Sequence, residues 1–133
     1  MAERMLRELR IESAELSILL TDDLFIHRLN LEHRGKDRPT DVLSFPLMDP
    51  EDESLQRLDG GALGDVVISI DTAQRQADHR GHGLLDEVCF LLAHGLLHLL
   101  GYDHQTDTEE AEMNTLTRRL VGVARPRSAS QVR

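Results

Sequence analysis

Three histidines in the last third of the chain have the residue type and spacing of metal ligands. They lie in the run HGLLHLLGYDH at residues 94–104. Because residues four apart share one face of a helix, His94 and His98 would direct their imidazoles to the same point. Gly101 comes about one turn later and can adopt the left-handed conformation that ends a helix, which would let the chain double back and bring His104 to that point.

This set of ligands indicates a catalytic zinc ion. Three neutral imidazoles leave the fourth position of a tetrahedral zinc ion open to water or substrate, unlike the closed four-ligand sites that only stabilise a fold. We expect one zinc ion per chain, although three imidazoles also accept nickel, copper or iron. The alternative is that these are isolated structural histidines on an apolar helix. Three buried imidazoles without a shared cation would each need a separate hydrogen-bond partner, so the spacing favours a metal.

Gly95 limits the reactions that such a site can perform. The histidines have the spacing of the zinc-peptidase motif HExxHxxGxxH, but Gly95 takes the place of the glutamate. That glutamate is the general base that activates the bound water, and glycine cannot accept a proton. The sequence therefore argues against a peptidase of that type. A metal-bound water has a pKa near neutrality, so a nucleophile would be available without a protein base.

Three motifs, taken together, resemble those of one known family. HGLLHLLGYDH at 94–104, RGKDRPTDVLSFP at 34–46 and LGDVVIS at 63–69 closely resemble the YbeY family of bacterial metal-dependent endoribonucleases, and the likeness extends from about Asn30 to about Met113. The resemblance implies a hydrolase that cleaves single-stranded RNA. It also implies maturation of ribosomal RNA, notably at the 3′ end of the small-subunit RNA, and a part in ribosome quality control.

The resemblance further implies roles for particular residues and partners. It implies zinc held by His94, His98 and His104, with His98 and Arg34 as catalytic residues in the cleft. The implied partners are ribosomal RNA and other single-stranded RNA, small-subunit ribosomal proteins and an assembly GTPase, with no membrane. Family members begin with a further strand before the first helix, whereas this chain opens with residues of helical character. We therefore expect either a truncated start or a sheet that lacks one edge strand.

Several charged residues near the motifs have more than one interpretation. Metal-bound imidazoles normally donate their second N–H to a carboxylate or carbonyl, so Asp41, Asp65 and Asp103 are candidates to orient the histidines. An aspartate at a strand start, however, often only completes a turn. Arg34 would stabilise charge on a phosphoryl oxygen, or would only form a surface salt bridge to Asp37. Water and the ribose 2′-hydroxyl are alternative nucleophiles for the cleavage.

Length and composition bound the class of protein. The chain has 133 residues, and we expect one metal-dependent hydrolase domain at 1–122 with a flexible tail at 123–133. Its single cysteine, Cys89, cannot form a disulfide within one chain, which fits a reducing compartment. The first ten residues alternate charge and hydrophobe, unlike a leader, and no apolar run is long enough to span a bilayer. We expect a cytoplasmic protein.

The net charge argues against broad electrostatic binding of nucleic acid. The formal charge is −9 at pH 7, whereas phosphate contacts need clustered lysines and arginines. Arg28, Arg34, Lys36 and Arg38 nevertheless gather in one short stretch. A local basic rim beside a dication can bind a phosphate strand, although the same stretch is also compatible with a solvated basic loop.

The pattern of apolar residues predicts an α+β fold. We expect a small mixed sheet of about three to four strands packed with about five helices, and a metal site on a buried helix and the loop that follows it. Strands are predicted at 14–20, 41–45 and 66–70, and helices at 1–10, 24–33, 71–79, 84–100 and 106–120. The helix at 84–100 is apolar on nearly every face, so it should be buried. Residues 48–61 carry acids, proline and glycines, which predicts a mobile loop.

Two functions besides an endoribonuclease are compatible with these residues. One is a zinc metallohydrolase of another class, such as an amidase or peptidase that obtains its base elsewhere. The other is a non-catalytic ribosome-assembly factor in which the metal only links helix to loop. Cleavage of single-stranded RNA by the metal-loaded protein, lost in His98→Ala and Arg34→Ala, would separate the first function from these two.

Overall fold

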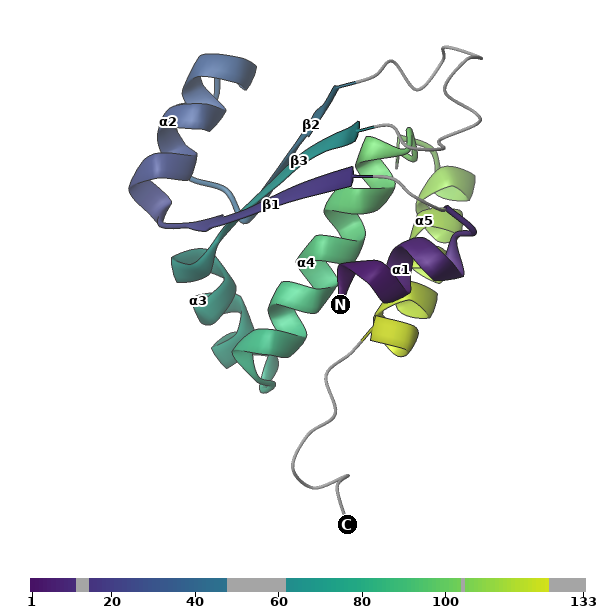
Figure 1. Cartoon of the computed structure of the whole chain (residues 1–133). Coiled ribbons are helices and arrows are strands. Elements are labelled where there is room, and N and C mark those ends of the chain that lie inside the picture. Colours follow the sequence, from purple (N-terminus) through teal and green to yellow (C-terminus); the bar gives the residue numbers. More distant parts are fainter. Residues whose placement is uncertain (12–14, 48–61, 104, 125–133) are drawn as a thin grey trace.

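A three-stranded sheet and five helices make up the part of the chain that the computed structural model describes, residues 1–11, 15–47, 62–103 and 105–124 (Figure 1). In chain order the elements are α1 (Ala2–Glu8), β1 (Glu15–Thr21), α2 (Asp23–Arg34), β2 (Val42–Pro46), β3 (Ala62–Ser69), α3 (Ile70–Arg80), α4 (Leu84–Leu99) and α5 (Asp107–Ala124). The predicted α+β class is confirmed. None of the described helices combines the length and the apolar character needed to cross a membrane.

The sheet is mixed, and β3 is its central strand. The strand order is β1-β3-β2, with β3 parallel to β1 and antiparallel to β2. Val66, Val67 and Ile68 of β3 are buried, as expected for β-branched residues of a strand that is covered on both faces. The central position of this strand therefore follows from its composition.

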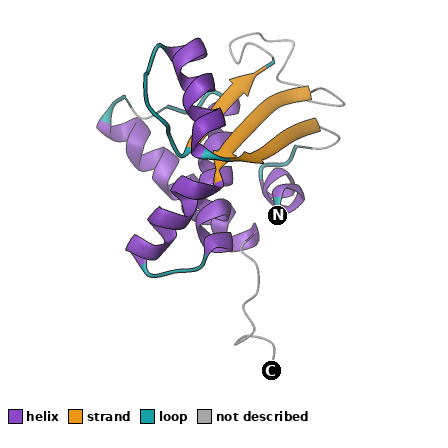
Figure 2. Cartoon of the chain, turned by 90° about the vertical axis from the view of Figure 1, so that its left-hand side faces the viewer, coloured by secondary structure: helices purple, strands orange, loops and turns teal. Residues whose placement is uncertain are grey.

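Each face of the sheet is covered by a different helix. Successive residues of a strand point to opposite faces, and Val67 packs with Ile26 of α2. Val66 and Ile68 instead belong to the larger core around α4. The two views agree that helices lie on both sides of the sheet (Figures 1 and 2).

Helix α4 is the central helix of the larger core. It packs against β2 and β3 of the sheet and against α3 and α5, and ten of its sixteen residues are buried. After the first turn, the residues of α4 that stay partly exposed are Phe90, His94 and His98. These three are spaced by four residues, so they form one stripe along the helix. The predicted burial of this helix is confirmed, and the stripe is the part of it that is open to a ligand.

Strand β3 differs from the prediction at both ends. It begins four residues before the predicted start, and Ile70 opens α3 rather than ending the strand. Ser69 ends the strand because its side chain accepts a hydrogen bond from the backbone N–H of Thr72, which caps α3. Gly64 permits the early start. Its φ is 139°, and a Cβ there would lie 2.3 Å from the carbonyl oxygen of Phe45 on β2.

Strand β2 and helix α5 also end later than predicted. Strand β2 includes Pro46, which is tolerated because β2 lies at an edge of the sheet. Helix α5 continues to Ala124, so the first two residues of the predicted tail are helical. The predicted mobile loop at 48–61 and the tail residues 125–133 lie outside the described residues.

Candidate metal centre and active site

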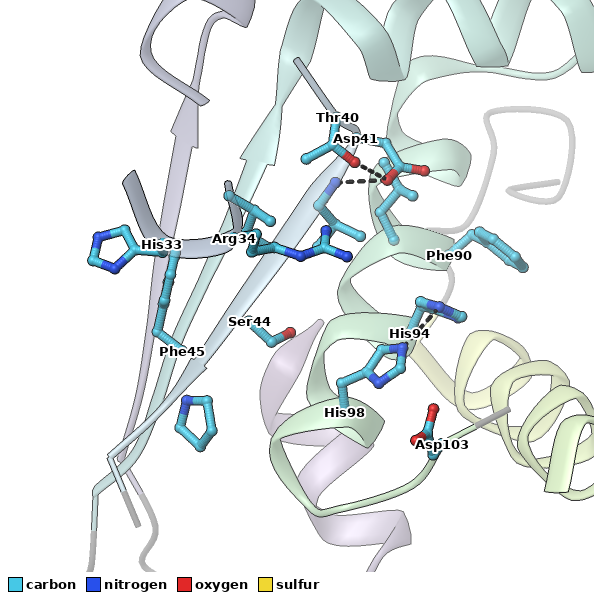
Figure 3. Close-up of a pocket in the computed structure, with 14 residues that line it drawn as sticks. His33, Arg34, Thr40, Asp41, Ser44, Phe45, Phe90, His94, His98 and Asp103 are labelled. Carbon is cyan, nitrogen blue, oxygen red and sulfur yellow. Dashed lines mark hydrogen bonds between the residues drawn. The ribbon is translucent and has the colours of Figure 1, made fainter. Parts of the chain in front are cut away.

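The partly exposed stripe of α4 forms one wall of a pocket. The pocket has a volume of about 860 Å³ and is also lined by β2 and by the C-terminal end of α2 (Figure 3). Five residues singled out in the sequence line it, and they are Arg34, Asp41, His94, His98 and Asp103. The fold thus brings together residues as distant in the sequence as Arg34 and Asp103, which are 69 positions apart.

His94 and His98 approach each other inside this pocket. Their Nε2 atoms are 3.2 Å apart, and the two ring planes make an angle of 75°. Two nitrogens that bind one tetrahedral zinc ion at about 2.0–2.1 Å are themselves about 3.3 Å apart. The separation therefore fits a shared cation, and it also fits a hydrogen bond from one neutral imidazole to the other.

The chain turns back after α4, as the sequence predicts. Gly101 is left-handed with a φ of 95°, and its backbone N–H donates to the carbonyl oxygen of His98. Asp103, two residues later, lines the pocket together with His94. His104 lies outside the described residues. Within the described ranges, no three His, Cys, Asp or Glu side chains form a group that could hold a metal ion, so the third ligand stays a prediction.

Arg34 is the last residue of α2, and the way that helix ends directs it to the pocket. Gly35 follows in the left-handed conformation with a φ of 68° and caps the helix. The Arg34 side chain extends into the pocket toward the two imidazoles (Figure 3). No salt bridge between described residues includes Arg34. Asp37, the alternative partner, instead lies 2.7 Å from Nε2 of His27, so among the described residues no carboxylate pairs with the Arg34 guanidinium.

The remaining members of the predicted basic rim lie outside the pocket lining. Arg28 is exposed on α2, and Lys36 and Arg38 are exposed in the loop that follows this helix. The side chain of Asn30 donates a hydrogen bond of 2.9 Å to the carbonyl oxygen of Arg38, which ties that loop to α2. Of the four cations, Arg34 is the one that lines the pocket.

Asp41 lies just before β2, lines the pocket and is held by three hydrogen bonds. Its Oδ1 accepts hydrogen bonds from the backbone N–H of Val42 at 2.7 Å and from the hydroxyl of Thr40 at 3.3 Å. Its Oδ2 accepts one from the side chain of Gln76 at 3.3 Å. Asp41 therefore fixes the start of β2 against α3 while lining the pocket.

Asp65 and Asp103 differ in the face they occupy. Val66 faces α4, so its neighbour Asp65 points to the opposite face of the sheet, and Asp65 does not line the pocket. The structure therefore does not bring Asp65 to the imidazoles, and Asp65 is not part of the proposed site. Asp103 follows Gly101 and lines the pocket beside His98 (Figure 3), which leaves it as the candidate carboxylate next to the histidines.

Phe90 and Ser44 are among the lining residues that were not assigned to the site from the sequence. Phe90 lines the pocket, and its ring stacks on the His94 imidazole with an interplanar angle of 18° and a centroid separation of 6.3 Å. Ser44 lines the pocket from β2. Phe90 lies one helical turn before His94, so an extension of the four-residue spacing would have found it. Ser44 has no comparable signal, because its hydrogen bond to the backbone of α4 at Gly95 depends on how the helix crosses the sheet.

Comparison with known proteins gives consistent matches over most of the chain. A family model described as Endoribonuclease YbeY matches residues 1–124. The endoribonuclease YbeY of Sulfurihydrogenibium sp. (strain YO3AOP1) is 50% identical over 114 residues, covering 84% of this chain and 70% of that relative. The endoribonuclease YbeY of Aquifex aeolicus (strain VF5) is 50% identical over 111 residues, covering 82% and 69%. The solution structure of TM1509 from Thermotoga maritima superposes with a TM-score of 0.62 at 28% identity, covering 90% of this chain and 75% of that one.

Proposed function

The chain belongs to the YbeY family of endoribonucleases, and on this premise we propose that it cleaves single-stranded RNA and matures the 3′ end of the small-subunit ribosomal RNA. One observation carries the proposal: Arg34 lines the same pocket as two imidazoles whose Nε2 atoms are 3.2 Å apart. A cation site beside a guanidinium suits a phosphodiester, because both stabilise negative charge on phosphoryl oxygens.

We assign one zinc ion to His94, His98 and His104. The separation of the first two Nε2 atoms supports this assignment, since it matches two ligands of one tetrahedral ion. A divalent ion held there supplies Lewis acidity toward a phosphoryl oxygen and lowers the pKa of water. Asp103 is the carboxylate assigned to accept an imidazole N–H, which would hold that ring in the tautomer that leaves Nε2 free to bind.

Arg34 binds and orients the phosphate in this proposal. Its guanidinium presents several N–H donors in one plane, which suits two oxygens of one phosphate. The pocket volume of about 860 Å³ is in the range of sites that enclose a small ligand. Such a pocket takes a short unstacked stretch of one strand rather than a duplex, which is how proteins usually read RNA loops and ends.

We further propose a cytoplasmic location, a part in ribosome quality control, and contacts with small-subunit ribosomal proteins and an assembly GTPase. The support for these is the family resemblance carried by the three motifs. The chemistry of the pocket supports only the RNA substrate, because a guanidinium beside two imidazoles suits a phosphodiester.

The test is cleavage of a fluorescent single-stranded RNA by the purified, zinc-loaded chain, beside a duplex of the same sequence. His98→Ala and Arg34→Ala should each reduce kcat/KM at least 100-fold, as expected for loss of a metal ligand or of an electrostatic stabiliser. His79→Ala is the matched control, because His79 is exposed on α3 and does not line the pocket. It should cleave like the parent chain.

The outcomes separate the three candidate functions. Cleavage that persists in His98→Ala and Arg34→Ala at the parental rate would trace the activity to a contaminant. No cleavage by the parent, with loss of folding in His98→Ala, would favour a structural metal in an assembly factor. Peptide hydrolysis abolished by a chelator would favour a metallohydrolase of another class. A 2′-deoxy substitution at the scissile nucleotide blocks attack by the 2′-hydroxyl but not attack by water, so it identifies the nucleophile.

A further inference from the structure

A fully buried carboxylate lies near the pocket, outside the residues used so far. The side chain of Glu87, on α4, has no exposed surface. Arg80 donates to both of its oxygens through one terminal guanidinium nitrogen, at 3.1 and 3.3 Å, and Nε2 of His82 lies 2.6 Å from Oε1. Because a carboxylate removed from water is unfavourable unless cations and hydrogen bonds compensate it, Glu87 restricts where these two side chains can lie.

Arg80 connects this carboxylate to the wall of the pocket. Its guanidinium carbon lies 5.0 Å from the centroid of the Phe90 ring, within the range of a cation–π contact. Phe90 in turn lines the pocket and stacks on His94. Figure 3 shows Phe90 and Arg34 on different sides of the His94 imidazole. Arg80, the last residue of α3, therefore lies next to the Phe90 end of the stripe on α4.

We propose that Arg80 is a second phosphate-binding residue for the RNA strand, and that Glu87 and Phe90 position it. The proposal rests on the proposed function, since it concerns a strand already bound at His94 and Arg34. With Arg80 included, the RNA-binding site is longer than the pocket and has one arginine on each side of the imidazoles.

The exposure of Arg80 supports this role. Its side chain is 45% exposed, whereas the Glu87 carboxylate is fully buried, so the positive end of the pair faces solvent. A guanidinium has five N–H donors. One terminal nitrogen of Arg80 serves Glu87, and the donors on its other nitrogens make no hydrogen bond to a described residue. They are therefore available to phosphate oxygens.

The alternative role for this cluster is to fix the turn between α3 and α4, because Arg80 ends α3 and His82 lies in that turn. A measurement of stability does not separate the two roles. The salt dependence of RNA binding does separate them, because each arginine that contacts a phosphate contributes to counterion release, and a residue that only fixes a turn does not.

The experiment measures binding of a fluorescein-labelled, unstructured single-stranded RNA by anisotropy over a range of NaCl concentrations. Arg80→Gln should weaken binding at low salt roughly tenfold and should reduce the slope of log K against log salt by about 0.7, the value for one phosphate contact on a single strand. Arg80→Lys keeps the charge and should restore most of the slope. Arg118→Gln is the charge-matched control, because Arg118 is exposed on α5 and outside the pocket lining. It should bind like the parent.

A second measurement needs no variant of Arg80 and so does not depend on its folding. Bound RNA should protect Arg80 several-fold from an arginine-specific reagent such as phenylglyoxal, read out by mass spectrometry, while Arg118 stays reactive. Equal modification of Arg80 with and without RNA would overturn the proposal, as would parental affinity and slope in a folded Arg80→Gln chain.

The outcomes also separate this proposal from the proposed function. If the parent binds RNA with the Arg80 contribution but does not cleave it, the proposed function fails and the phosphate contact stands. If the parent cleaves RNA and Arg80→Gln binds it unchanged, the function stands and the contact fails. A parent chain that neither binds nor cleaves RNA overturns both.

Discussion

The hydroxyl of Ser44 donates a hydrogen bond of 2.8 Å to the backbone carbonyl oxygen of Gly95, so α4 lies directly against β2 between its two histidines. A Cβ on Gly95 would lie 2.8 Å from Cγ1 of Val66 and 3.2 Å from Oγ of Ser44. The position that follows His94 therefore faces strands β2 and β3 of the sheet. Close packing favours glycine here, because the Cβ of any larger residue would press against Val66 unless the helix or the sheet shifted.

This contact predicts that Gly95→Ala destabilises the chain. The added methyl group would overpack the space beside Val66, which typically costs about 1–3 kcal/mol. The higher helix propensity of alanine offsets about 1 kcal/mol of this at most. Urea unfolding followed by circular dichroism should show a lower midpoint than for the parent, with an unchanged m-value.

Gly122→Ala is the matched control for this substitution. Gly122 also lies within a helix, α5, but a Cβ there would meet no atom within 4 Å. The same change should stabilise the chain by about 0.5–1 kcal/mol, because alanine has the lower conformational entropy in the unfolded state. If Gly95→Ala proved as stable as Gly122→Ala, the close approach of α4 to the sheet would be wrong.

A second prediction concerns Asp23, which joins the N-terminal ends of α2 and α3. Burial raises the pKa of its carboxyl, but hydrogen bonds from Ser69, Thr72 and Arg75, together with the Arg75 charge, outweigh burial and lower the pKa from 3.8 to about 2. The two hydroxyls donate at 2.6 Å, and Arg75 donates at 2.7 Å. A pKa that is lower in the folded state means that ionised Asp23 stabilises the fold.

The direction of this pKa shift determines the pH range in which Asp23 stabilises the fold. The stabilisation is fully present above about pH 4, the pKa of an unfolded aspartate, and is lost as the pH falls through about 2. Asp23→Asn should therefore lower the unfolding free energy by about 1–2 kcal/mol at pH 7, and the difference from the parent should narrow toward pH 2. Urea unfolding of both chains at pH 7 and pH 2.5 measures it. Glu112→Gln, an exposed change on α5, is the control. A difference that stays constant with pH would show that the asparagine acts through packing alone.

The sequence predicts the helical part of the site because the relevant information is local. The apolar residues of α4 predict its burial, and the spacing of His94 and His98 predicts that their imidazoles meet. Gly101 predicts the end of the helix through its own backbone preference, and the structure gives it a φ of 95°. Each of these inferences uses residues within a few turns of one another.

The parts that the sequence did not predict depend on contacts between distant segments. Asp65 was a candidate beside the histidines, but its face is set by strand alternation and by which face α4 covers. The burial of Glu87 depends on Arg80 and His82, which reach it from the preceding helix and turn. The preference for glycine at 95 depends on the approach of Val66. None of these relationships has a signature in one local window.

A third prediction concerns removal of the metal. If His94 and His98 bind a zinc ion that the unfolded chain does not hold, the ion stabilises the fold by mass action, by about 3 kcal/mol at a free zinc concentration 100 times the Kd. Protein purified without an affinity tag or chelator should contain close to one zinc per chain by elemental mass spectrometry. His94→Ala should lose the zinc, and a chelator should lower the Tm of the parent but not of this variant. A parent chain without zinc, or with a Tm that a chelator leaves unchanged, would contradict the assignment.

The last prediction separates the charge of Arg34 from its shape. No described carboxylate pairs with Arg34, and its guanidinium extends toward the imidazoles. Arg34→Lys keeps the charge but loses the planar fork that binds two phosphate oxygens at once, so it should recover only part of the activity that Arg34→Ala loses. We expect kcat to fall about 100-fold or more in Arg34→Ala and about tenfold in Arg34→Lys, with zinc content unchanged in both. Measuring kcat and bound zinc on the same preparations tests this prediction. A loss of zinc in Arg34→Lys would contradict it, since Arg34 would then act on the metal site and not on the phosphate.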